Sequence, residues 1–197
     1  LKKPAPEYIF QRTNSPEKAP NKFEKCHLSF LKGNLIAINK KKDSPKNLLK
    51  KLNDMGKKHG IGRVDLVENR FLGIKSRGVY ETPGGTILLF AHRAIESITL
   101  NHNQQHLKEE LMPKFAELIY NGFWFSKERK KIQKIIDQTQ KNVEGTVKLK
   151  LYKGNITILE RFSKKSIYSK DIASFEKTKG FNSKNAEKFI KRKRYKF

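Results

Sequence analysis

The chain has 197 residues, a length close to one ordinary domain or two small ones, and hydrophobic residues make up 36% of it. Its 44 Lys and Arg outnumber its 19 Asp and Glu, which gives a net charge of +25. The single cysteine excludes a disulfide framework and any cysteine-rich zinc module. No apolar run approaches the roughly 18 residues of a membrane span. We therefore expect a cytoplasmic protein without membrane contact, and a first residue Leu1 in place of Met suggests a piece of a longer product.

The positive charge raises the question of a nucleic-acid partner, because Lys and Arg neutralise phosphates. Lysine supplies most of the charge and is scattered along the chain, whereas bidentate phosphate and base recognition favours arginine. We therefore do not favour a nucleic-acid role. The exception is the basic block at residues 191–196, which also suits the C-terminal end of a helix.

The first elements can be predicted from turn and cap residues. Prolines and a lack of apolar periodicity over residues 1–25 indicate an extended lead-in that lies against the rest. A hairpin is predicted around Lys32-Gly33-Asn34, with strands at 27–30 and 35–38. Ser44 followed by proline predicts a helix start, and Gly60 predicts its end.

In the middle of the chain we expect two strands followed by two helices. Two short strands are predicted at 61–67 and 71–82, and Pro83 then opens a helix with one apolar face. A further helix is expected over about 103–121, and Pro113 predicts a kink or a break inside it.

The last elements begin after an aromatic run at residues 123–125, which we interpret as part of the core. Ser126 predicts the cap of another helix, and a second hairpin is predicted around Lys153-Gly154-Asn155. Ser183 predicts the start of a final helix, whose narrow apolar stripe suits docking onto another subunit and contains Ala186, Phe189 and Ile190.

Hairpins and helices thus come in blocks, which predicts an α+β fold of antiparallel hairpins with packed helices, not a doubly wound parallel sheet. We expect three parts: the extended lead-in at 1–25, a body at 26–165, and a basic C-terminal arm at 166–197 that serves oligomerisation.

One window differs in character from the lysine-rich remainder. Residues 60–85 hold half of the 12 Gly, and cations alternate there with anions: Arg63, Asp65, Glu68, Arg70, Arg77 and Glu81. Such mixed charges on glycine-spaced strands suit a zwitterionic ligand, since a carboxylate can receive an ammonium group while an arginine braces it. Structural ion pairs beside tight turns explain the same residues equally well.

The same window carries a resemblance to a known family. It closely resembles the C-terminal domain of argininosuccinate synthases, and the likeness covers nearly the whole chain through long, specific strings at residues 15–20, 59–71, 73–86, 114–126 and 148–155. The resemblance implies an ATP-dependent ligase of arginine synthesis that joins citrulline and aspartate through a citrullyl-adenylate. The body would then be a synthetase and multimerisation domain, and the assembly a homotetramer.

The resemblance also implies site residues. It makes Glu68 and Tyr80 citrulline contacts, which agrees with their chemistry because a carboxylate binds an α-ammonium group and a phenol can donate or accept a hydrogen bond. Arg63, Arg70 and Arg77 lie in the same motifs and are expected to support them as ion-pair partners.

The departures from the family are equally informative. The family's Ser-Gly-Gly-rich nucleotide loop is absent from the sequence, so ATP and Mg²⁺, the contacts to aspartate and the other citrulline contacts are expected upstream of Leu1. The chain alone is therefore predicted to be inactive. A non-catalytic oligomerising remnant and a basic nucleic-acid-binding protein are the alternatives.

Other candidate sites are weaker. Gly84-Gly85 at a helix start could receive an anion but lacks the remainder of a phosphate loop, so a plain turn is favoured. His102 and His106 could share a helix face, but no third metal ligand lies nearby in the sequence, and Cys26 is expected to be a buried, inert thiol.

Overall fold

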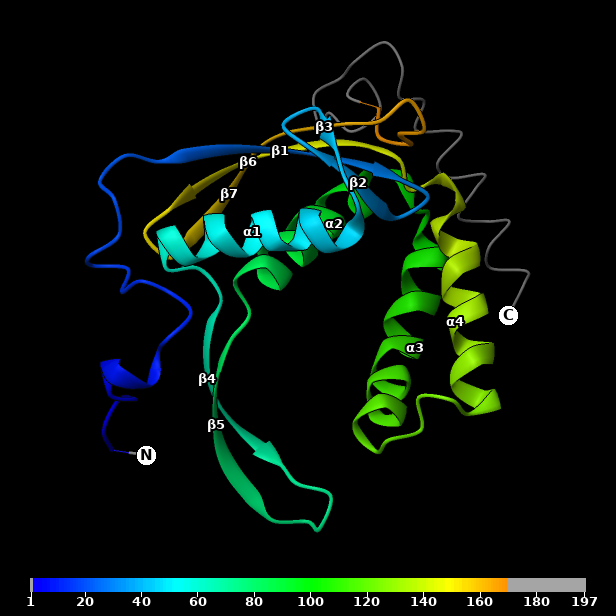
Figure 1. Ribbon diagram of the computed structural model, residues 1–197. Helices are drawn as coiled ribbons and strands as arrows, with labels where there is room; N and C mark the ends of the chain where they lie inside the picture. The colour runs from blue at the N-terminus through cyan, green and yellow to red at the C-terminus, as the bar shows by residue number, and fades with distance from the viewer. Residues whose placement is uncertain (1, 170–197) are drawn as a thin grey trace, which may run out of the picture.

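The computed structural model describes residues 2–169, and its elements confirm an α+β fold (Figure 1). In chain order they are η1 Glu7–Ile9, β1 Glu24–Leu31, β2 Asn34–Ile38, β3 Lys41–Lys42, α1 Pro45–His59, β4 Arg63–Asn69, β5 Lys75–Glu81, α2 Pro83–Thr99, α3 His102–Tyr120, α4 Lys127–Thr139, η2 Gln140–Asn142, β6 Gly145–Tyr152 and β7 Asn155–Phe162.

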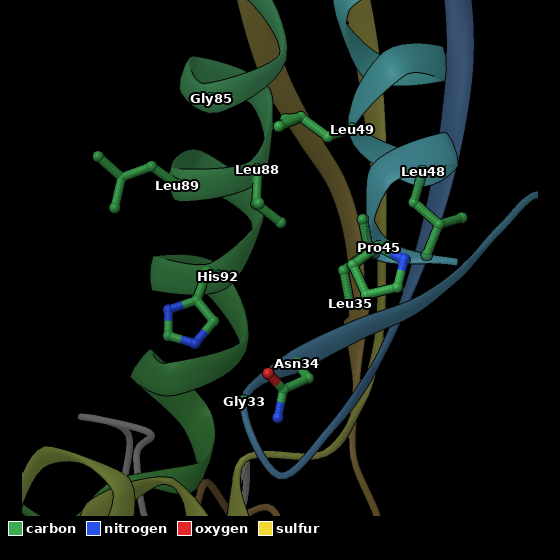
Figure 2. Close-up of a pocket in the computed structure, with 10 residues that line it drawn as sticks. All are labelled: Gly33, Asn34, Leu35, Pro45, Leu48, Leu49, Gly85, Leu88, Leu89 and His92. Carbon is green, nitrogen blue, oxygen red and sulfur yellow. The ribbon is translucent and has the colours of Figure 1, made fainter. Parts of the chain in front are cut away.

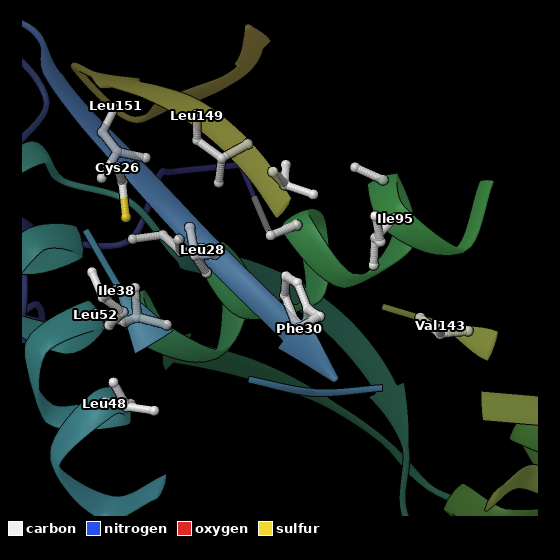
Figure 3. Packing of buried hydrophobic residues seen from close by; sticks show 14 of the residues in the cluster. Cys26, Leu28, Phe30, Ile38, Leu48, Leu52, Ile95, Val143, Leu149 and Leu151 are labelled. Atoms are coloured by element: carbon white, nitrogen blue, oxygen red, sulfur yellow. The ribbon is translucent and has the colours of Figure 1, made fainter. Parts of the chain in front are cut away.

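The centre of the structure is a five-stranded antiparallel sheet in the order β3-β2-β1-β6-β7, with α1 and α2 against one face (Figure 1). From here on, the body means this sheet together with α1 and α2. Alternate residues of the central strands turn toward these helices and form the core (Figure 3), as the period of two along a strand requires. Those of β1 and β6 are Cys26, Leu28, Phe30, Val147, Leu149 and Leu151.

The cap and turn signals of the body are confirmed. The Ser44 hydroxyl accepts a hydrogen bond from the backbone amide of Asn47, and Gly60 ends α1 in the left-handed conformation at φ 68°. Both predicted hairpins form, β1–β2 and β6–β7, and each turn holds its first residue, Lys32 or Lys153, at positive φ.

Two hairpins project from the helix-covered side of the sheet (Figure 1). The first is the two-stranded β4–β5 ribbon. Its strands lie two to four residues later than predicted at their starts, because the turn is built from Arg70 to Ile74, where the Arg70 amide donates to the Ile74 carbonyl. Residues 61 and 62 instead join α1 to the ribbon, and Ile61 is buried in the core.

The second projection is the helical hairpin of α3 and α4. A kink or a break was predicted at Pro113, and the break does not occur, because Pro113 lies inside a continuous α3. The interpretation of residues 123–125 as core is wrong, because Phe123, Trp124 and Phe125 are 53%, 49% and 81% exposed at the tip. Trp124 is instead covered by the guanidinium of Arg129, which lies 4.8 Å from its ring.

The lead-in contains a 3-10 turn at Glu7–Ile9 and a second turn in which the amides of Lys18 and Ala19 donate to the Ser15 carbonyl, and it reaches β1 at Glu24. Within residues 2–169 no helix has the length and apolar character needed to cross a bilayer. The helix predicted from Ser183 and the basic block at 191–196 lie outside the described residues, as does most of the predicted arm at 166–197.

Candidate functional site

The β4–β5 ribbon has two faces of different chemistry. Residues directly opposite one another in an antiparallel pair share a face, and successive residues alternate between faces. Glu68 pairs with Ser76, and Tyr80 with Val64, which puts Glu68 and Tyr80 on the same side. We call this side the Glu68 face; it consists of Val64, Leu66, Glu68, Ser76, Gly78 and Tyr80. The opposite side, the Glu81 face, carries Arg63, Asp65, Val67, Arg77, Val79 and Glu81.

Glu68 and Tyr80 are in direct contact. The Tyr80 hydroxyl donates a hydrogen bond to Glu68 Oε1 at 2.5 Å. The ring reaches Glu68 by lying across Gly78, where an added Cβ would stand 2.8 Å from the Tyr80 hydroxyl oxygen. Glycine at this position therefore provides the space through which the two predicted site residues meet.

Arg70 completes the arrangement on the Glu68 face. Its guanidinium lies 3.5 Å from Glu68 Oε1, and its Nε donates to the Ser76 hydroxyl at 2.7 Å, which orients the side chain. Of the three arginines expected to support the site, Arg70 is the one that stands beside Glu68. Ser76 was missed by the sequence analysis, since its place opposite Glu68 follows only from the strand register.

The contacts on this face affect the pKa of Tyr80 and involve one oxygen of Glu68. The hydrogen bond to Glu68, together with burial and its charge, raises the pKa of Tyr80, so the phenol remains a protonated donor near neutral pH. Both contacts to Glu68 fall on Oε1, and Oε2 has no hydrogen-bond partner among residues 2–169. A carboxylate braced at one oxygen and open at the other can accept an ammonium group.

Arg63 and Arg77 lie on the Glu81 face and make different ion pairs. Arg63 binds Glu7 of the lead-in at 2.8 Å, and Arg77 binds Asp65 across the ribbon with two hydrogen bonds. The hydrogen bond from Arg77 lowers the pKa of Asp65 despite some desolvation. Ion pairs thus occur on both faces of the ribbon, Arg63–Glu7 and Arg77–Asp65 on one and Arg70–Glu68 on the other.

At the start of α2, Gly84 serves helix packing, whereas Gly85 is exposed and has no close neighbour. The Gly84 amide donates to the Asn53 side chain of α1 at 2.9 Å. A Cβ on Gly84 would stand 2.8 Å from the Asn53 backbone nitrogen, and one on Gly56 would clash with Pro83, so both glycines let α1 and α2 cross closely. These residues do not fit a phosphate cradle, because the first helical amide and the space in front of it are already occupied.

The weaker candidates gain no support as sites. The His102 and His106 rings contact each other edge to face at 4.2 Å, and the described part of the chain contains no group of three potential metal ligands. Cys26 is a fully buried free thiol, and burial raises its pKa to about 12, which keeps it protonated and unreactive.

A separate pocket of about 440 Å³ lies between the β1–β2 turn, α1 and α2 (Figure 2). Its lining is mainly apolar, with Leu35, Leu48, Leu88 and Leu89 around it and His92 at one side. None of its lining residues belongs to the ribbon, so it is distinct from the Glu68 face.

Comparison with known proteins finds a matching family and similar relatives. The family model described as "Arginosuccinate synthase C-terminal domain" matches residues 1–196. A protein of Pelagibacter ubique named argininosuccinate synthase is 62% identical over 189 residues, which are 96% of this chain and 48% of the relative.

Two further relatives carry the same name. That of Mesorhizobium japonicum is 58% identical over 187 residues, covering 94% of this chain and 46% of the relative. That of Aliarcobacter butzleri is 60% identical over 179 residues, covering 91% of this chain and 43% of the relative. The chain therefore spans about half the length of the curated relatives it matches.

Proposed function

The chain belongs to the argininosuccinate synthase family, whose C-terminal domain it matches over residues 1–196, and we propose a function on this basis. The chain forms the citrulline-binding side of the active site of such a ligase. The complete enzyme would join citrulline to aspartate at the expense of ATP, through a citrullyl-adenylate, in the cytoplasm.

The observation that carries this proposal is the braced carboxylate of Glu68. Its Oε1 contacts Tyr80 and Arg70, while Oε2 has no hydrogen-bond partner among residues 2–169, and the Glu68 side chain is 22% exposed. The α-ammonium of citrulline is a suitable partner, because a hydrogen bond between two charged groups is shorter and stronger than a neutral one. The Tyr80 phenol, 41% exposed, can add a second contact at the polar end of the same substrate.

The remaining substrates would be held by residues outside this chain. Backbone amides bind the phosphates of ATP, and carboxylates bind Mg²⁺. At the start of α2 the Gly84 amide cannot bind a phosphate, because it already donates to the Asn53 side chain. We propose that aspartate and ATP bind mainly to an N-terminal half and that the complete enzyme assembles as a homotetramer. ATP would supply the activation of the citrulline ureido group, and this chain would orient the citrulline.

Complementation tests the proposal. AMP and pyrophosphate release from ATP, citrulline and aspartate is measured with the 197 residues alone, and then with the N-terminal half of the Pelagibacter ubique relative fused ahead of Leu1. We expect no turnover by the chain alone and citrulline-dependent turnover by the fusion. Turnover by the chain alone would overturn the proposal that this chain forms only one side of the active site. A fusion that folds but releases no AMP would favour the non-catalytic remnant.

A further inference from the structure

The back of the ribbon is fastened to the lead-in through a carboxylate, Glu81. It accepts hydrogen bonds from the backbone amides of Gln11 at 2.8 Å and Arg12 at 2.9 Å, and from the Thr13 hydroxyl at 2.6 Å. Burial raises the pKa of Glu81, but the hydrogen bonds from Thr13, Arg12 and Gln11 outweigh that effect and leave the pKa lowered. The ionised form therefore holds three consecutive lead-in residues.

Arg63 lies opposite Glu81 on the neighbouring strand and on the same face, and it binds the same segment of the lead-in. Its guanidinium binds both carboxylate oxygens of Glu7 at 2.8 and 2.9 Å, and donates to the Thr13 hydroxyl and carbonyl at 2.8 Å each. It also covers the Phe10 ring at 4.0 Å. The fork geometry of arginine suits this, since it fixes direction as well as charge. We call Glu7, Thr13, Arg63 and Glu81 the clasp.

Beyond the clasp, the Arg77 guanidinium also donates to the Lys3 carbonyl of the lead-in at 3.1 Å, but the ribbon has little buried surface to fix its direction. No residue of β4 is buried, and Gly78 is the only buried residue of β5. At the base, the Thr82 amide donates to the Gly62 carbonyl, which anchors the first pair to the body. Immediately after the clasp, the Asn14 amide donates to the Lys57 carbonyl at the end of α1, so the lead-in is itself fixed to the body.

We propose that Arg63 and Glu81 are positioning residues, which fasten the lead-in to the back of the ribbon and so orient Glu68 and Tyr80 on its front toward the half of the enzyme that precedes the lead-in. The inference rests on the proposed function. Their place on the opposite face means that they act through the ribbon backbone and do not touch citrulline.

The clasp can be tested first in the 197-residue chain, without any activity. Spin labels at Leu72→Cys on the ribbon tip, which is 82% exposed, and Lys50→Cys on α1 report the direction of the ribbon as a distance distribution. Cys26 is fully buried and stays unlabelled. We expect Glu81→Gln and Thr13→Val each to lose the narrow distribution of the parent chain.

A matched control is Glu128→Gln, which removes an ion pair with Lys114 at 2.9 Å on the helical hairpin and should leave the distribution narrow. Far-UV circular dichroism establishes whether each variant keeps its fold. If Glu81→Gln fails to fold, the isosteric variant Thr13→Val still tests the clasp. A narrow distribution in both clasp variants would overturn the inference.

The functional consequence is measured in the active fusion. Misplacing a substrate contact by about 1 Å can cost about 100-fold, so Glu81→Gln should raise the KM for citrulline by roughly 10- to 100-fold. The KM for ATP and the kcat at saturating citrulline should stay near the parent values, a split that general destabilisation would not produce.

Glu68→Gln, measured in parallel, separates two failures. A raised citrulline KM for Glu68→Gln with an unchanged value for Glu81→Gln would overturn the positioning role and leave the proposed function standing. An unchanged citrulline KM for Glu68→Gln would remove the proposed function, and the positioning role with it.

Discussion

The five-stranded sheet and the β4–β5 ribbon are both antiparallel, yet different forces hold them. In the sheet, every second residue of β6 from Val147 to Leu151 is fully buried against helices, and the residues between them are lysines. In the ribbon, Val67 and Leu66 are exposed, and polar contacts to a lead-in nearly 70 residues earlier hold its back. The body is stabilised by burial and the candidate site by hydrogen bonds, so the two should respond differently to substitution.

The largest expected effect lies in the sheet. Leu149→Ala leaves a cavity in a fully buried position and should lower the free energy of unfolding by about 4 kcal/mol. The matched ribbon variant is Val67→Ala, whose side chain is 46% exposed and whose loss should cost no more than about 0.5 kcal/mol. Urea unfolding of both variants measures the difference. Equal losses would show that the ribbon is part of the core.

A buried carboxylate extends the comparison to the helical hairpin. Glu96 of α2 accepts hydrogen bonds from Lys108 of α3 at 2.6 Å and from Gln140 at 2.8 Å, and it lies 3.5 Å from His92 Nδ1. Burial raises the pKa of Glu96, but His92 and Lys108 outweigh it and lower the pKa to about 2.

Glu96→Gln should therefore cost about 3 kcal/mol at pH 7, because Lys108 loses its partner in a largely buried position. The contribution of a carboxylate with a lowered pKa is complete above its ordinary value of 4.5 and is lost as the pH falls from there toward 2. Unfolding in urea at pH 7 and pH 3 should accordingly show a smaller gap between parent and variant at pH 3. A gap independent of pH would contradict this account of Glu96.

The sequence predicted most of the body because its signals are local. Ser44 and Gly60 delimit α1 through bonds to residues at most four positions away, and glycine-containing turns set both sheet hairpins. The aromatic run at 123–125 failed, since aromatic residues predict a core only where another element covers them.

The candidate site was predictable only in part. Glu68 and Tyr80 came from a family resemblance, and their contact depends on a register that the misplaced turn would have shifted. Arg63 and Glu81 of the clasp stood out as charges in the 60–85 window, but their partners in the lead-in did not, because Thr13 and Glu81 are separated by 68 positions and no motif links them.

Gly78 offers a way to disturb the site without disturbing the body. A methyl group there would stand 2.8 Å from the Tyr80 hydroxyl oxygen, and the exposed Tyr80 side chain can move away at little cost in stability. Gly78→Ala should thus raise the citrulline KM of the fusion about tenfold, the equivalent of about 1.4 kcal/mol, while thermal unfolding stays near that of the parent. A fall in stability with an unchanged KM would contradict the role given to Gly78.

Acid should release the clasp with the smallest effect of all. Because the folded-state pKa of Glu81 lies below its ordinary value of 4.5, its contribution is present above pH 4.5 and declines as the pH falls further. The spin-label distance from ribbon tip to α1 should stay narrow from about pH 5 to pH 7 and widen below 4.5. A distribution that is already wide at pH 7 would contradict the clasp.

The citrulline dependence of Glu68→Gln in the active fusion tests the central claim most directly. A hydrogen bond to a charged group is worth about 1.5–3 kcal/mol, so the substitution should reduce kcat/KM for citrulline by roughly 10- to 150-fold while the KM values for ATP and aspartate change little. The control is Glu160→Gln, an exposed carboxylate on β7 that lies 3.8 Å from Lys148 and should have no effect. A Glu68→Gln enzyme with the parent's citrulline dependence would contradict the account and leave Glu68 as a structural partner of Tyr80 and Arg70.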